Sequence, residues 1–350
     1  MDNNSTPPAA SRRSFMTKAA STFTGVGAGL ALGACGGGSS GVSAAAPVVS
    51  SGAPCTAVAP KPQAIAWPAP MMVPGGSRTN AMNIAVREFG NPSGKPILFI
   101  HGFSQSMQCW NHQVMAAELI GFRLITMDLR GHGDSDRALP ANFPNAGYQP
   151  VDQADDVAAV IAAKGLVKPV IVAWSFGGIV LGDYLKAHGT GKVAGLNFVG
   201  ALTRFEATHT SDFLGPGFLG VAVDWFSPIW PNNIKGSINF VAACTNAPLS
   251  VDDFATTLAC NIAVPWTNRA ATGIRPDIFH DQTTLNSIAP VPTVVTHGSA
   301  DQVVLPASSD AIVAAIAGAT LSRYDGVGHM PFVEDVARFN RELAALRASV

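Results

Sequence analysis

The sequence predicts an α/β fold in which a mostly parallel sheet is flanked by helices. From residue 83 to residue 199, runs rich in β-branched residues alternate with segments whose apolar residues recur at helical spacing. Several of these strands end in short polar or glycine-rich turns, where open α/β sheets place their functional side chains. The chain has 350 residues, 47% hydrophobic and 13% charged, which suffices for one large core.

The first residues indicate export rather than a folded domain. Residues 11–18 resemble the twin-arginine export signal, in which paired arginines precede an apolar stretch. Residues 19–34 are too few and too weakly apolar to span a membrane. We therefore expect residues 1–34 to be a removable signal peptide for transport across a bacterial inner membrane. Cys35 ends a Leu-Gly-Ala-Cys sequence that resembles a bacterial lipobox, with ordinary signal cleavage nearby as the alternative.

This interpretation places the protein in the periplasm or cell envelope, held at a membrane surface by a lipid on Cys35. Residues 35–75 are rich in Ala, Pro, Ser and Gly, which predicts a flexible linker. An oxidising compartment permits disulfides among the other cysteines. Cys244 and Cys260 lie sixteen residues apart and are the candidate pair, with Cys55 and Cys109 as the remainder.

Charge and spacing argue against two classes of function. The formal net charge is -1 and no basic stripe is present, so we expect no nucleic-acid partner. No Cys-x-x-Cys pair or His-rich spacing indicates a metal site.

The core begins with two strands of different character. Residues 83–90 alternate apolar and polar side chains, which predicts an edge strand exposed on one face. Residues 95–100 form a continuous apolar run, typical of a central parallel strand, and end in a His-Gly turn. A helix is expected over residues 109–120, followed by a buried strand over residues 122–127.

A strand, a sharp turn and a helix meet at Ser175. β-branched residues fill positions 170–172, and helical spacing resumes after Gly177 and Gly178. A serine at such a turn is strained, which is tolerable only if its neighbours two residues away are small, as Ala173 and Gly177 are. The stretch resembles the Gly-x-Ser-x-Gly nucleophile elbow of the α/β-hydrolase family, with alanine in the first glycine position. An incidental serine acting as a helix N-cap is the alternative.

The resemblance also implies an oxyanion hole. In that family one donor is the backbone N–H after a His-Gly turn, and the other is the N–H after the nucleophile. In this sequence these are the N–H groups of Phe103 and Phe176. Gly102 would let the backbone approach the substrate closely. A common turn without function is the alternative for the His-Gly pair.

The run over residues 128–135 looks like the Asp-x-Arg-Gly-x-Gly-x-Ser turn of the same family. That resemblance implies a structural role, in which Asp128 and Arg130 satisfy buried backbone groups and each other. Three aspartates precede a helix predicted over residues 157–163, and they would favour its positive end rather than bind a metal. They are Asp152, Asp155 and Asp156.

The alternation of strands and helices stops at residues 203–289, which are dense in Phe, Trp, Gly and Pro and poor in charge. We expect a mostly helical cap there, inserted into a core of residues 76–202 and 290–350. An aromatic cap would exclude water and favour an apolar acyl or alcohol group. For each aromatic residue, filling the cap's own small core is the alternative. His209 and His280 carry no motif.

Two strand ends after the cap complete the candidate site. The run from residue 291 is a buried strand that ends in a polar turn, and Asp301 occupies the position where the family places its triad acid. Asp310 is a poorer candidate. His329, in a Gly-His loop before the last helix, matches the family's catalytic histidine. The chain order Ser175, Asp301, His329 is the order used by α/β-hydrolases.

These residue types predict a serine hydrolase with an acyl-enzyme intermediate. His329 would take the proton as Ser175 attacks an acyl carbon, while Asp301 would fix the imidazole tautomer. No cofactor or metal is needed for this chemistry. We expect a carboxylic-ester hydrolase that acts on a neutral or apolar ester. Alternatives are a cofactor-free haloperoxidase or perhydrolase, a lactonase or a carbon-carbon hydrolase, and, outside enzymes, a binding lipoprotein with an inactive fold.

Overall fold

The computed structural model describes residues 67–76, 81–137, 147–203, 213–273, 282–288 and 290–350. Predictions for the signal peptide, the linker up to residue 66, Cys35 and Cys55 lie outside the described residues, as do those for His209 and His280.

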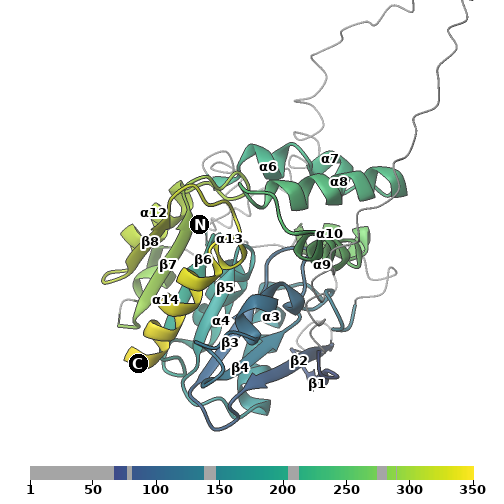
Figure 1. Cartoon of the computed structure of the whole chain (residues 1–350). Coiled ribbons are helices and arrows are strands. Elements are labelled where there is room, and N and C mark those ends of the chain that lie inside the picture. The colour runs from purple at the N-terminus through teal and green to yellow at the C-terminus, as the bar shows by residue number, and fades with distance from the viewer. Residues whose placement is uncertain (1–66, 77–80, 138–146, 204–212, 274–281, 289) are drawn as a thin grey trace, which may run out of the picture. The chain divides into compact units, whose positions relative to one another are not determined.

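In the described residues, one sheet of eight strands has the order β1-β2-β4-β3-β5-β6-β7-β8 (Figure 1). The strands are β1 Met71–Pro74, β2 Asn83–Gly90, β3 Pro96–Ile100, β4 Arg123–Met127, β5 Val170–Trp174, β6 Gly195–Val199, β7 Thr293–Gly298 and β8 Thr320–Tyr324. All neighbours from β4 to β8 pair in parallel. Only β1 with β2 and β2 with β4 are antiparallel among the described strands. The mostly parallel sheet confirms the predicted fold class.

β1 corrects two predictions. Met71–Pro74 falls in the segment predicted as a linker, yet it pairs with β2 in a register that places Met71 opposite Val86. β1 therefore forms the edge of the sheet, and β2 is a neighbour of the edge with four consecutive buried residues. Four residues are too few to show a period in the sequence, and Val73 is the one side chain of β1 that is buried.

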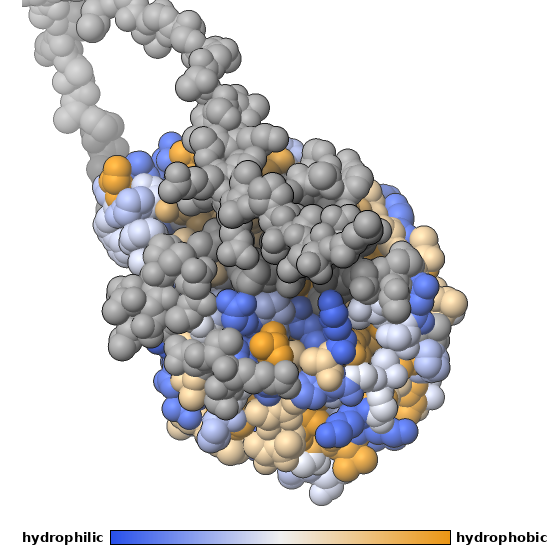
Figure 2. All heavy atoms as spheres, turned by 180° about the vertical axis from the view of Figure 1, so that it is seen from behind, coloured by the Kyte–Doolittle hydropathy of each residue, from blue (hydrophilic) through white to orange (hydrophobic). Residues whose placement is uncertain are grey.

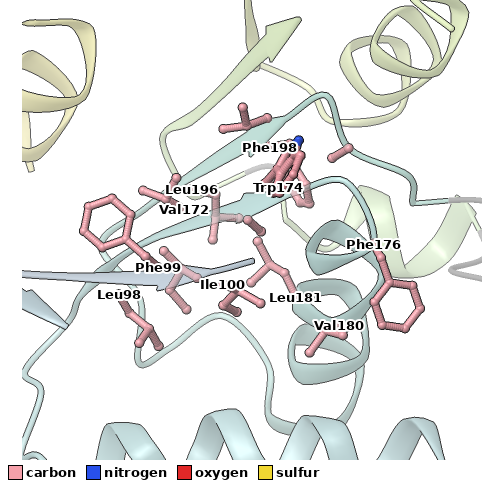
Figure 3. Packing of buried hydrophobic residues seen from close by; sticks show 14 of the residues in the cluster. Leu98, Phe99, Ile100, Val172, Trp174, Phe176, Val180, Leu181, Leu196 and Phe198 are labelled. Atoms are coloured by element: carbon pink, nitrogen blue, oxygen red, sulfur yellow. The ribbon is translucent and has the colours of Figure 1, made fainter. Parts of the chain in front are cut away.

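The central strands are covered on both faces. Every residue of β3, β5 and β6 is buried, which explains their continuous apolar runs. The core helices are η2 Met107–Trp110, α2 Asn111–Val114, α3 Pro150–Ala163, α4 Gly177–His188, α12 Ala307–Ala315, α13 Pro331–Glu334 and α14 Val336–Ser349. α3 packs against α4, whereas α2 packs against α13 and α14. Figure 3 shows side chains of β3, β5, β6 and α4 packed together in this core.

Two helices differ from their predicted bounds. α3 begins at Pro150, seven residues before the predicted start, because proline at the first helical position has a preset φ and lacks only an N–H that would be unpaired there. The helix predicted over residues 109–120 is instead the short η2 and α2, which end at Val114. Apolar spacing continues beyond Val114, but those residues form turns.

Residues 203–289, called the cap segment below, are mostly helical where they are described, and Leu214 forms an isolated antiparallel bridge with Val304. The helices are α6 Pro216–Leu219, α7 Ala222–Trp225, α8 Trp230–Ala243, α9 Val251–Ile262, α10 Trp266–Gly273 and α11 Gln282–Asn286. They follow β6 and precede β7. Figure 1 shows α6, α7 and α8 beyond the carboxyl ends of the strands.

The predicted disulfide is wrong, because Cys244 and Cys260 are both free thiols. Cys244 lies at the end of α8, where its backbone carbonyl accepts a hydrogen bond from the His329 N–H at 2.8 Å. Cys260 lies in α9 and accepts a hydrogen bond from the Ser106 hydroxyl at 3.0 Å. The two helices thus present their cysteines to different parts of the core. Cys109 is free as well.

Hydrophilic and hydrophobic side chains are interspersed on the face shown in Figure 2. Within the described ranges, no helix combines the length and the apolar character needed to cross a membrane.

Candidate active site

Ser175 sits at a strained turn between β5 and α4. Its φ is +56°, a conformation that non-glycine residues rarely adopt. Its N–H donates to Val199 O at 2.9 Å, which ties the turn to β6. A Cβ on Gly177 would lie 2.8 Å from His101 O, and one on Gly178 would lie 2.7 Å from Leu202 O. The two glycines are therefore required for the elbow to pack, as predicted.

Asp301 and His329 form a buried hydrogen-bonded pair. His329 Nδ1 lies 2.7 Å from Asp301 Oδ2, and both side chains are fully buried. β5 precedes Ser175, β7 precedes Asp301 and β8 precedes His329. In the sheet, β5, β6, β7 and β8 are consecutive neighbours. Parallel strands end at one edge of the sheet, so the topology brings the three predicted residues together.

The free nitrogen of the imidazole is available to a proton donor. Among the described residues, His329 Nε2 has no hydrogen-bond partner, although it is buried. Catalytic hydrogen bonds are commonly long before substrate binds and shorten in the complex. A buried Nε2 with an acceptor already fixed at Nδ1 can take a proton from a serine hydroxyl.

Asp301 is held in its ionised form. Burial alone would raise its pKa, but the charge of His329 and the hydrogen bonds from His297 and His329 outweigh burial and lower the pKa to about 2. Oδ1 also accepts the backbone N–H groups of Val303 at 2.8 Å and Val304 at 3.0 Å. The carboxylate therefore stays charged at neutral pH, as the acid of a triad must.

The lowered pKa of Asp301 predicts that the folded protein loses stability at acidic pH. The native carboxyl binds a proton less readily than the unfolded one, so its contribution is present above the ordinary pKa of 3.8 and is lost as the pH falls towards about 2. The contribution is on the order of 2 kcal/mol. Denaturant unfolding of the wild type and of Asp301→Asn, measured from pH 3 to pH 6, should give a steeper loss in the wild type. Parallel curves would contradict this expectation.

His297 is a second histidine on Asp301 that the sequence analysis missed. Its Nε2 lies 3.1 Å from Asp301 Oδ2 and 2.9 Å from Val304 O. Both neighbours are acceptors, so Nε2 carries the proton and donates to them. His297 thus helps to orient the carboxylate. It lies in β7, four residues before Asp301, where a buried strand residue gives no signal of this role.

Gly200 and Trp174 shape the space around His329. Gly200 has a φ of +46°, and a Cβ there would lie 3.1 Å from His329 Nδ1 and 3.4 Å from Asp301 Oδ2. The indole Nε1 of Trp174 donates to His329 O at 2.9 Å. Glycine after β6 therefore makes room for the pair, and the residue before the nucleophile holds the histidine loop.

The predicted oxyanion loop lies against Ser175. A Cβ on Gly102 would be 3.1 Å from Ser175 Cβ. His101 Nε2 accepts the Leu129 N–H at 2.9 Å, so its Nδ1 carries the proton and donates to Gly102 O at 2.8 Å. That carbonyl shares a trans peptide with the Phe103 N–H, and the two groups point in opposite directions. Holding the carbonyl therefore fixes the direction of the N–H.

Two neutral histidines support this loop. Burial, with a further contribution from His132, lowers the pKa of His101 well below its ordinary value. Burial likewise lowers the pKa of His132 to about 4. His132 Nδ1 donates to Arg130 O at 3.0 Å, and its Nε2 accepts the Ser104 N–H at 3.2 Å. Each ring needs one protonated and one bare nitrogen for these bonds, which neutrality provides.

Aromatic side chains of the cap segment cover Phe103. Its ring lies 5.4 Å from that of Trp225, 6.0 Å from that of Phe226 and 5.7 Å from that of Phe176. In Figure 3 the Phe176 ring points away from the aliphatic side chains of the sheet. Trp225 also stacks on Phe240 at 3.9 Å, so it fills the core of the cap segment as well. Among the described residues, Trp225 and Phe226 thus give the cap segment an apolar surface against Phe103.

Asp128 and Arg130 have structural roles, but they are not partners of each other. Asp128 accepts the N–H groups of Met107 at 2.7 Å and Asp134 at 2.9 Å, and burial raises its pKa to about 7. Arg130 instead forms a bidentate pair with Asp156 at 2.6 and 2.7 Å. Of the three aspartates predicted at the start of the helix, Asp152 lies in the first turn of α3, whereas Asp156 lies further along α3 and neutralises the buried arginine.

Asp310, the other candidate for the triad acid, has a different partner. Asp310 pairs with Arg323 at 2.6 Å, with 61% of its side chain exposed, and does not approach His329. In the part of the chain that the structure describes, no three His, Cys, Asp or Glu residues are grouped so that they could hold a metal ion.

The sequence pattern of the alpha/beta hydrolase fold matches residues 95–336, which is more than half of the chain. The chain belongs to the α/β-hydrolase fold family. An esterase from Rhodococcus sp. has a crystal structure that is 32% identical in sequence, with a TM-score of 0.71 over 80% of this hydrolase and 99% of that chain.

Curated relatives of this hydrolase include non-heme peroxidases. A non-heme haloperoxidase of Rhodococcus erythropolis is 27% identical over 267 residues, which are 73% of this chain and 93% of the relative. A non-heme chloroperoxidase of Kitasatospora aureofaciens is 26% identical over 274 residues, 75% of this chain and 95% of the relative. The family and the esterase similarity show that the protein is a hydrolase.

Proposed function

We propose that this hydrolase cleaves carboxylic esters through an acyl-enzyme on Ser175. The observation that carries the proposal is the buried Asp301–His329 pair, whose Nε2 is unpartnered among the described residues, at the same edge of the sheet as a serine with a φ of +56°. Similarity to an esterase over almost the full length of that chain supports it.

The reaction follows from these positions. Ser175 Oγ bonds to the acyl carbon as its proton passes to His329 Nε2, and Asp301 stabilises the imidazolium. The N–H groups of Phe103 and Phe176 hold the oxyanion, and loss of one such donor typically costs about 3 kcal/mol. The alcohol leaves with the proton from His329. Water then donates a proton to His329 and attacks the acyl carbon. His329 returns this proton to Ser175 Oγ as the bond between Oγ and the acyl carbon breaks, which releases the carboxylic acid and restores Ser175.

The aromatic cover over Phe103 favours an apolar acyl or alcohol group. For p-nitrophenyl esters of increasing chain length, kcat/KM should rise about fourfold for each added CH₂ until the apolar space is filled, because each buried CH₂ contributes about 0.8 kcal/mol. Phe226→Ala should flatten this rise. Trp230→Ala is the matched control, because Trp230 is a cap aromatic that is 64% exposed. Preference for a charged acyl group, or equal effects of the two variants, would contradict the assignment.

Perhydrolysis is a second candidate, favoured by the two non-heme peroxidase relatives. Hydrogen peroxide would replace water in the attack on the acyl-enzyme, and a peracid would leave instead of the acid. The test supplies ester, peroxide and bromide and follows bromination of a dye. Bromination that requires both the ester and Ser175 supports this activity. Ester hydrolysis without any bromination rules it out.

We also propose that the protein is exported and lipid-anchored at Cys35, on the support of the twin-arginine and lipobox resemblances in its first residues. Metabolic labelling with a clickable fatty acid should mark the wild type and Cys55→Ala, and it should not mark Cys35→Ala. The Cys55 variant controls for general effects of losing a cysteine in the same region. An unlabelled wild type, or label retained in Cys35→Ala, would remove the anchor.

A further inference from the structure

Arg269, in α10 of the cap segment, reaches the oxyanion loop of the core. Its guanidinium Nε donates to Ser104 Oγ at 2.9 Å, and Ser104 directly follows Phe103. The arginine side chain is 0% exposed. A buried arginine in the cap segment therefore bonds the residue next to the proposed oxyanion donor.

The charge of Arg269 is balanced by carbonyl groups. Among the described residues, no carboxylate lies within ion-pair distance of it. Nη1 donates to Trp225 O at 2.6 Å, while Nη2 donates to Asn261 O at 2.9 Å and Val264 O at 3.3 Å. Trp225 and Asn261 belong to the last turns of α7 and α9, where backbone carbonyls lack helical partners and favour a cation. The guanidinium also lies 4.9 Å from the Trp225 ring centre, a cation–π contact.

Ser104 is held in an unusual conformation by three contacts. Its φ is +54°. Its hydroxyl accepts from Arg269 and donates to Asn261 O at 3.3 Å, and its N–H donates to His132 Nε2 at 3.2 Å. A strained non-glycine residue persists only where its surroundings fix it. Two of the three contacts come from the cap segment, so the cap segment helps to set the backbone that follows Phe103.

We propose that Arg269 is a positioning residue for the oxyanion hole, which it couples to the cap segment through Ser104. This inference rests on the proposed function. The peptide before Phe103 is fixed by His101. In the peptide after it, the Ser104 N–H is held by His132, while Arg269 holds the Ser104 hydroxyl. The Phe103 N–H is therefore aimed from both sides. Loss of the arginine contact loosens one side. A buried positive charge near the hole also favours the negative oxyanion over the neutral ester.

The test compares Arg269→Met, Ser104→Ala and Asn233→Ala in the full-length chain. Asn233 is the matched control, because its side chain donates to the same Trp225 carbonyl at 2.8 Å without reaching the oxyanion loop. We expect Arg269→Met and Ser104→Ala to lower kcat for a p-nitrophenyl ester about 10- to 100-fold, with KM changed less than threefold. Affinity for an aryl trifluoromethyl ketone, which forms a tetrahedral adduct, should fall by the same factor. Asn233→Ala should change each value less than threefold.

Ser104→Ala keeps the proposal testable if Arg269→Met fails to fold, because it removes only a hydroxyl. Wild-type kcat and ketone affinity in Ser104→Ala would overturn the inference, as would an equal loss in Asn233→Ala. A wild type that hydrolyses no ester in the panel would instead overturn the proposed function, which separates the two failures.

Discussion

Ser175→Ala is expected to lower kcat for ester hydrolysis by roughly 10⁵- to 10⁶-fold, with little change in KM. The hydroxyl is the atom that forms the acyl-enzyme, and in the described structure no other group is placed at the elbow to replace it. Removing one oxygen from a residue that is 7% exposed leaves the fold intact. The measurement is kcat and KM for a p-nitrophenyl ester, with the wild type and variant purified from separate cultures to exclude carry-over.

The residual kcat of Ser175→Ala shows whether Ser175 has a covalent role in the reaction. A variant that keeps more than about 1% of the wild-type kcat would contradict a covalent role for Ser175. Thermal unfolding serves as the control for folding, because a lost nucleophile should leave the melting temperature close to that of the wild type.

Asp301→Asn is expected to lower kcat by about 10⁴-fold, as removal of the charge from a triad acid does elsewhere. The hydrogen bonds that Asp301 accepts explain this expected loss. Both carboxylate oxygens accept hydrogen bonds, Oδ1 from Val303 and Val304 and Oδ2 from His329 and His297. An asparagine amide would place an N–H₂ group against one set of these donors. His329 would then lose its orientation or adopt the wrong tautomer.

The control for this variant is Asp310→Asn. Asp310 is the other aspartate considered for the acid, and it is an exposed partner of Arg323. Its replacement should leave kcat within twofold of the wild type. Equal losses in the two variants, or a loss below tenfold in Asp301→Asn, would contradict the assignment of Asp301 as the acid.

The sequence was sufficient for the central parallel strands, whereas β1 lies in the segment predicted as a linker. Continuous apolar runs identified the buried strands, and the turn after each run held the candidate residues. Ser175, Asp301 and His329 were predicted from their resemblance to α/β-hydrolase motifs, and the parallel strands that precede them end at one edge of the sheet. The elbow glycines followed from sterics, since a side chain at Gly177 would meet backbone carbonyls of β3 and its turn.

The residues that escaped prediction act through contacts that no sequence pattern indicates. Arg130 pairs with Asp156, 26 residues away, rather than with the nearby Asp128. Arg269 bonds Ser104 across 165 residues, and His297 bonds Asp301 from inside a buried strand. Neither spacing nor periodicity reports such contacts. The predicted Cys244–Cys260 disulfide was wrong because closeness in the sequence does not imply contact. The two cysteines lie on different helices and have different partners.

Labelling with a fluorophosphonate probe reports whether Ser175 is an activated nucleophile, because only a serine made nucleophilic by its neighbours reacts. We expect one labelled peptide, identified by mass spectrometry as the one that contains Ser175. Labelling should be lost in His329→Ala, although Ser175 is still present. A label on a different residue, or labelling of Ser175 at the wild-type rate in His329→Ala, would contradict the account.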